Sequence, residues 1–119
     1  MIQPISHYLL EDIKHGLFTR QGGVSQGIYK GLNVGLGSND DVQHILQNRK
    51  LVAEFFGSND IYSCFQIHSN KVTVIDSQDK LWDSKNCPES DAIVCNQKGI
   101  PISVLSADCG TVLLDDTNN

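Results

Sequence analysis

Residues 100–115 read IPISVLSADCGTVLLD, and this stretch organises the expected fold. Its two short apolar runs, 100–105 and 111–114, are bounded by turn formers, a pattern typical of buried strands. The polar break between them places Asp108 beside Cys109 where the backbone leaves a sheet. A free cysteine is more often a small apolar core group, but a thiol at such a strand exit can also be reactive or bind metal. The stretch alone leaves both roles open for Cys109.

The composition is that of an ordinary acidic globular domain. The chain has 119 residues and a net charge of −5, with no lysine or arginine run, which argues against nucleic acid as a partner. No segment is long and apolar enough to cross a bilayer, and the N-terminus lacks the features of a secretory signal. The four cysteines show no CxxC spacing. We therefore expect a cytoplasmic protein with reduced cysteines and no membrane partner.

The rest of the chain predicts one helix and several short strands. Apolar residues recur at helical spacing between Asp40 and Gly57, with Asn39 or Asp40 as the N-cap and Gly57 as the end. Strands are expected at residues 13–20, 61–66, 71–75 and 91–95, and the turn at 96–99 is of the hairpin type. This pattern predicts an α+β fold of hairpin strands and few helices, in one domain over residues 1–119.

A glycine-rich loop lies between the first expected strand and the helix. Its six glycines, between Gly22 and Gly37, exclude a helix and indicate either tight turns or main-chain N–H groups that face a ligand. The spacing fits neither a Walker A loop nor a dinucleotide fingerprint. Arg20, next to this loop, modestly favours an anion site, and hairpin turns are at least as good an explanation.

The end of the sequence predicts an unpaired strand. Residues 111–114 run into the turn sequence 115–119, and no strand follows. Because a buried strand needs a partner for its backbone groups, we expect this chain to be a fragment of a longer protein, with self-association through the open edge as the alternative.

Five blocks of sequence together resemble a known family. The blocks are His15–Ser25 with Gly27, Tyr29, Leu32 and Asn33; Asn48-Arg49; Gln66–Ser69; Asp91–Val94; and Ala107–Cys109 followed by Val112–Leu114. In this order they resemble the YfiH-type laccase-domain family, also called DUF152. Its members were first described as multicopper polyphenol oxidoreductases and later as purine nucleoside phosphorylases with adenosine deaminase activity.

The resemblance implies a layered fold with mixed, largely antiparallel sheets, shared with a bacterial cytotoxin. It also implies that His68 and Cys109 are two of three metal ligands, with zinc, or alternatively copper, as the metal. The third family ligand is a histidine in a block beyond residue 119, so the chain would be the N-terminal part of the domain. Gly110 stands where a proline commonly follows the cysteine, a departure that affects the local turn.

The implied activity is phosphorolysis and deamination of adenosine, inosine and methylthioadenosine, with phosphate as co-substrate. His68, Cys109 and Asp108 would form the catalytic site, with Asp108 orienting a water or moving a proton. Arg20, and less strongly Asn33, are the candidates for binding phosphate or ribose. Three alternatives stay open: a copper polyphenol oxidase, a metal-free hydrolase that uses Cys109 and a histidine, and a truncated domain without activity.

Overall fold

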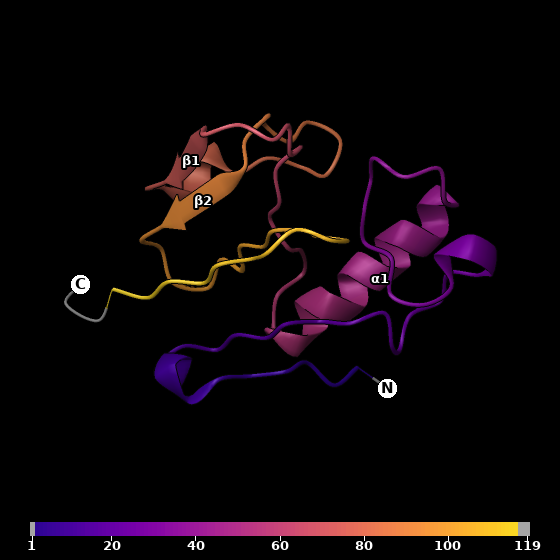
Figure 1. The fold of residues 1–119 in the computed structure, drawn as a ribbon. Helices are drawn as coiled ribbons and strands as arrows, with labels where there is room; N and C mark the ends of the chain where they lie inside the picture. Colours follow the sequence, from indigo (N-terminus) through magenta and orange to yellow (C-terminus); the bar gives the residue numbers. More distant parts are fainter. Residues whose placement is uncertain (1, 117–119) are drawn as a thin grey trace.

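One long helix and one pair of strands lie apart in the molecule, with extended segments between them (Figure 1). The computed structural model describes residues 2–116. Helix α1 spans Val42–Phe55, and strands β1 and β2 span Val72–Ile75 and Ala92–Cys95. Short 3-10 turns occupy Tyr8–Leu10 (η1), Gly27–Tyr29 (η2) and Gln78–Lys80 (η3). The predicted α+β class is confirmed. No helix in this described range has the length and apolar character that crossing a membrane requires.

Helix α1 forms where its apolar spacing predicts it. Asp41 is its N-cap and accepts a hydrogen bond from the Gln43 backbone N–H at 2.8 Å. The predicted cap, Asp40, instead accepts from the Ser25 hydroxyl. Gly57, at φ +70°, follows the last turn of the helix and donates to the Glu54 carbonyl at 3.0 Å, as the sequence predicts.

The strand pairing differs from the predicted hairpins. Strands β1 and β2 are parallel, with Val72 opposite Ala92 and Ile75 opposite Cys95. A parallel pair needs a long connection between its strands, and residues 76–91 supply it. The turn at 96–99 does not fold residues 100–105 back on β2, because Ile102 forms a parallel bridge with Tyr62. The expectation of largely antiparallel pairing is therefore wrong for the one sheet in the described residues.

Several predicted strands are extended segments with isolated bridges. Ile5 bridges Leu17 in antiparallel fashion, and Phe65 bridges Glu89 in parallel. Residues 111–114 are exposed and form no strand or bridge within the described range, so the prediction of a buried strand there is wrong. What covers this segment is untested, and the last residues of the predicted turn, 117–119, lie outside the described residues.

The core joins α1 to the glycine-rich loop and to the segment after the helix. Its buried apolar members are Leu32, Val52, Ala53 and Ile61. The same face of α1 also buries Asn48 and Arg49, two polar residues. The Arg49 guanidinium donates to the carbonyls of Val34, at 3.1 Å, and of Ile61, at 2.9 Å. This arginine therefore ties the glycine-rich loop to the segment that leads to His68.

Candidate functional site

His68 lies in a tight turn with a backbone conformation that is unusual for its residue type. Its φ is +59°, and it is the only residue other than glycine with a positive φ in the described range. A non-glycine residue in the left-handed region persists where its surroundings hold it, and such residues cluster at functional sites. The side chain of His68 is exposed, and its ring has no hydrogen-bond partner among residues 2–116.

The Asp91 carboxylate holds the His68 turn. One of its oxygens accepts the backbone N–H groups of Ile67, at 3.1 Å, and His68, at 2.9 Å. The other accepts the Ser69 N–H at 2.8 Å and the Ser69 hydroxyl at 2.6 Å. These bonds favour the charged carboxylate, with the Ser69 hydroxyl first among them, and they lower the pKa of Asp91 to about 2. Asp91 thus anchors the turn from the start of β2.

Replacing Asp91 by asparagine is expected to lower the urea midpoint of unfolding at pH 7. An amide offers one acceptor oxygen and turns its own donors against the backbone N–H groups of the turn. Because the folded-state pKa of Asp91 is depressed, its stabilisation is present above the unfolded value near 4 and is lost as the pH falls through about 2. The difference between wild type and Asp91→Asn should therefore shrink between about pH 4 and pH 2.

Urea unfolding followed by circular dichroism at pH 7 and pH 3 checks this expectation. The matched control is Asp12→Asn, since Asp12 is exposed and has no hydrogen bond among the described residues. An Asp91→Asn variant as stable as the control variant at pH 7 would show that the carboxylate does not anchor the turn.

Cys109 is exposed, whereas Cys64, Cys87 and Cys95 are half-buried. Cys109 is therefore not part of the core formed by the described residues. Asp108 next to it is also exposed, and its carboxylate has no partner among residues 2–116. The Ser106 hydroxyl donates to the Cys109 carbonyl at 2.5 Å and closes the turn that presents the thiol.

The segments that carry His68 and Cys109 run side by side in the same direction. The Tyr62 N–H donates to the Pro101 carbonyl and the Ser103 N–H donates to the Tyr62 carbonyl, both at 2.9 Å. Gln66 then bonds Leu105 through its side-chain amide. His68 follows Gln66 by two residues, and Cys109 follows Leu105 by four.

A thiolate and an imidazole are donors that suit zinc or copper. The donor atoms of His68 and Cys109 therefore fit zinc or copper, but two protein ligands are too few for a complete metal site. No group of three or more histidine, cysteine or acidic side chains in the described part of the chain could hold an ion. A metal bound by His68 and Cys109 would need a further donor from outside residues 2–116.

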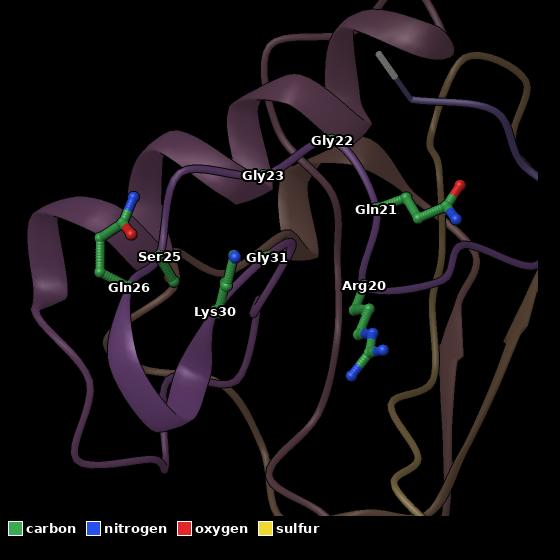
Figure 2. A pocket seen from close by; sticks show the side chains of 8 residues that line it. All are labelled: Arg20, Gln21, Gly22, Gly23, Ser25, Gln26, Lys30 and Gly31. Atoms are coloured by element: carbon green, nitrogen blue, oxygen red, sulfur yellow. The ribbon is translucent and has the colours of Figure 1, made fainter.

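Arg20 lines a separate hollow of about 380 Å³ beside the glycine-rich loop (Figure 2). Its lining includes a second cation, Lys30, and no acidic residue. In Figure 2, Lys30 points toward the turn of Gly22 and Gly23, and the Arg20 guanidinium points away from it. The N–H groups of these two glycines have no partner among the described residues. Two cations and free N–H groups make this hollow suitable for an anion.

Gly31 is required for the shape of this hollow. A Cβ atom at this position would lie 2.1 Å from the Arg20 carbonyl oxygen, and its φ is +118°. The close approach allows the Leu32 N–H to donate to that carbonyl at 2.7 Å. Arg20 is a predicted residue of this hollow, whereas Lys30 is not, because its charge is the only sequence signal that it carries.

Asn33, the other predicted substrate ligand, lies apart from this lining. Its amide nitrogen donates to the Ser38 hydroxyl at 3.0 Å and to the Asp40 carboxylate at 3.2 Å, and its amide oxygen accepts the Gly35 N–H at 3.1 Å. These bonds hold the loop that leads into α1. A direct role for Asn33 with substrate is untested by the structure.

Comparison with known proteins identifies a family model and several relatives that the chain matches. Residues 14–119 match a family model described as multi-copper polyphenol oxidoreductase laccase. The chain is 42% identical over 102 residues to a purine nucleoside phosphorylase of Corynebacterium glutamicum, a match that covers 84% of this chain and 41% of the relative. It is 36% identical over 103 residues to a purine nucleoside phosphorylase of Streptomyces coelicolor, covering 85% of this chain and 41% of that protein.

A solved structure has a similar fold. The crystal structure of a Neisseria meningitidis protein assigned to DUF152 superposes with a TM-score of 0.63 at 32% sequence identity. The match covers 77% of this chain and 36% of that one. The chain thus spans less than half the length of the proteins that it matches.

Proposed function

The chain belongs to the multi-copper polyphenol oxidoreductase laccase family, and on that premise we propose that it supplies part of the active site of a purine nucleoside phosphorylase. Relatives of this chain that carry the name purine nucleoside phosphorylase support the proposal. The observation that carries it is the exposed thiol of Cys109 on a segment that runs beside the His68 turn.

His68 and Cys109 are proposed as two ligands of a zinc or copper ion whose remaining donors come from outside this chain. When bound, such an ion supplies Lewis acidity and an acidified water. Asp108, next to Cys109 in sequence and without a side-chain partner among residues 2–116, is our candidate for orienting a water or moving a proton. These roles cover adenosine deamination as well as phosphorolysis, with adenosine, inosine and methylthioadenosine as the proposed substrates.

Phosphorolysis requires a binding site for phosphate as well as for the nucleoside. An oxygen of phosphate forms a bond to ribose C1′ while the bond from C1′ to the purine nitrogen breaks, and the purine leaves with a proton. The phosphate must be held in place during this exchange. We assign that task to Arg20 and Lys30 with the N–H groups of Gly22 and Gly23, because they line one hollow without an opposing carboxylate.

The other activities fit the described donors less well. A copper oxidase that reduces oxygen wants several copper ions, whereas His68 and Cys109 are proposed as ligands of a single ion. A metal-free hydrolase would want the imidazole hydrogen-bonded to the thiol, and no such bond joins His68 to Cys109 within the described range. The phosphorylase proposal needs neither feature.

The proposal predicts release of a purine base that depends on inorganic phosphate. The protein to assay is a fusion of this chain with the remaining length of the Corynebacterium glutamicum relative, since the chain spans 41% of that protein. Inosine should yield hypoxanthine and ribose 1-phosphate, which chromatography separates. Arg20→Ala should raise KM for phosphate by roughly tenfold or more, because a charged hydrogen bond contributes about 1.5–3 kcal/mol.

Lys50→Ala is the matched control, since it removes one exposed positive charge on α1 away from the hollow. Its KM for phosphate should equal that of the unaltered fusion. Base release at the same rate without phosphate would contradict phosphorolysis, and equal KM values for the two variants would remove Arg20 from the phosphate site.

A further inference from the structure

We propose that Gln66 is a positioning residue whose side-chain amide fixes the Cys109 segment against the His68 turn. The inference rests on the proposed function, because that function makes His68 and Cys109 ligands of one ion. The Gln66 amide nitrogen donates to the Leu105 carbonyl at 2.8 Å, and its amide oxygen accepts the Leu105 N–H at 2.8 Å. One side chain thereby pairs with both backbone groups of a residue, as a neighbouring strand would.

The Gln66 amide is the last tether before Cys109. Backbone bonds between the two segments end at the Ser103 N–H, which donates to the Tyr62 carbonyl. Beyond this point, no described residue of 104–110 forms a hydrogen bond to residues 61–69 except through Gln66. Among hydrogen bonds between the two segments, this one amide is therefore the last that holds the Cys109 segment beside the His68 turn.

The turn that carries His68 is held separately from the Cys109 segment. Asp91 binds the backbone N–H groups of Ile67, His68 and Ser69, so the turn keeps its shape whether or not Leu105 is attached. Asp91 fixes the backbone of the turn that carries His68, and Gln66 fixes the Cys109 segment against that turn. Loss of Gln66 should consequently free residues 104–109 while the His68 turn stays in place.

Only an amide satisfies both bonds at position 66. Leucine has a similar size but no polar atom. A glutamate carboxylate keeps an acceptor for the Leu105 N–H and has no donor for the Leu105 carbonyl, which it would repel. Gln66→Leu and Gln66→Glu should therefore have the same effect through different chemistry, and the second variant guards against a general packing defect in the first.

The first test measures the distance without any metal. A nitroxide is attached to Cys109, the exposed cysteine, and its broadening of the His68 amide resonance is recorded by NMR. In Gln66→Leu and Gln66→Glu the broadening should fall severalfold. Gln97→Leu is the matched control, because the Gln97 amide also donates to a backbone carbonyl, that of Asp76 at 3.0 Å, but lies outside this site. Unchanged broadening in both Gln66 variants would overturn the proposal.

The second test uses zinc as the probe, measured by competition with a chromogenic chelator. In the fusion, both Gln66 variants should bind Zn²⁺ severalfold more weakly than the unaltered protein, because the two proposed ligands are no longer held in one relative position. Gln97→Leu should bind as wild type does. Wild-type affinity in both Gln66 variants would contradict the positioning role.

His68→Ala and Cys109→Ser separate this inference from the proposed function. If neither substitution weakens zinc binding, the metal pair is wrong, while the nitroxide result still decides whether Gln66 sets the distance. If both weaken zinc binding and the Gln66 variants do not, the metal pair stands and the positioning role is wrong.

Discussion

Replacing Asn48 by alanine is expected to lower the free energy of unfolding by about 3–4 kcal/mol, the largest stability effect of any single change proposed for this chain. Asn48 has no exposed surface. Its amide nitrogen donates to the Ser25 hydroxyl at 2.9 Å and to the Asn33 carbonyl at 2.8 Å, and its amide oxygen accepts the Val24 N–H at 2.8 Å. Alanine leaves the Val24 N–H and the Asn33 carbonyl without this partner, while the Ser25 hydroxyl keeps its bond to Asp40, and each unsatisfied group costs about 1–3 kcal/mol.

Loss of Asn48 should also change the shape of the anion hollow, because Asn48 holds the glycine-rich loop that lines it. Urea unfolding followed by the helical circular dichroism signal measures the change. Gln47→Ala is the matched control, an exposed position on the same helix, where a shift within about 0.5 kcal/mol is expected. A loss below about 1 kcal/mol for Asn48→Ala would show that the loop does not depend on this residue.

The second large effect concerns the rate of catalysis. The 119-residue chain alone is expected to turn over adenosine roughly a hundredfold more slowly than its fusion to the remaining length of the Corynebacterium glutamicum relative. A catalytic zinc usually has three protein ligands, and the described residues hold no group of three donors. Initial rates of inosine and hypoxanthine formation from adenosine provide the measurement.

Cys109→Ser in the fusion is the matched variant, since it removes one proposed ligand and changes one atom. It should reduce the rate of the fusion to near that of the chain alone, with an unchanged circular dichroism spectrum. Equal rates for the chain alone and the fusion would contradict the account, because they would mean that two ligands suffice or that no metal is involved.

The helix was predictable and its exact cap was not. Apolar spacing between Asp40 and Gly57 predicts α1 because its buried residues recur on one face. Three consecutive polar residues, Asn39, Asp40 and Asp41, all favour a cap position. The choice falls on Asp41 because Asp40 is occupied by the Ser25 hydroxyl, a contact between residues that lie 15 apart in sequence.

The pairing of the strands was the main error. Turn residues at 96–99 predict a hairpin from local propensity alone. The structure pairs residues 100–105 with the distant segment 61–66, and it aligns β1 with β2 in parallel. Such pairing depends on the packing of the whole chain, and no local sequence pattern predicts it.

The sequence proposes the candidate residues of the site but not the contacts that hold them. The blocks around His68 and Cys109 single out both residues, whose roles stay predictions. Gln66 and Asp91 belong to those blocks, but their hydrogen bonds to Leu105 and to the His68 turn come from the tertiary fold. Asn33 differs from these residues. Its residue type suggests a substrate ligand, but its side-chain amide is bonded within its own loop.

The central claim is that the His68 imidazole and the Cys109 thiol bind one ion. A zinc titration of the fusion with the Corynebacterium glutamicum relative, labelled with ¹⁵N at its histidines, tests it directly, because the fusion can supply the further donor that the ion needs. The account predicts that the ring nitrogen resonance of His68 shifts and that Cys109 becomes protected from alkylation at the same zinc concentration. Protection of Cys109 with no change at His68, or two clearly different midpoints, would contradict it.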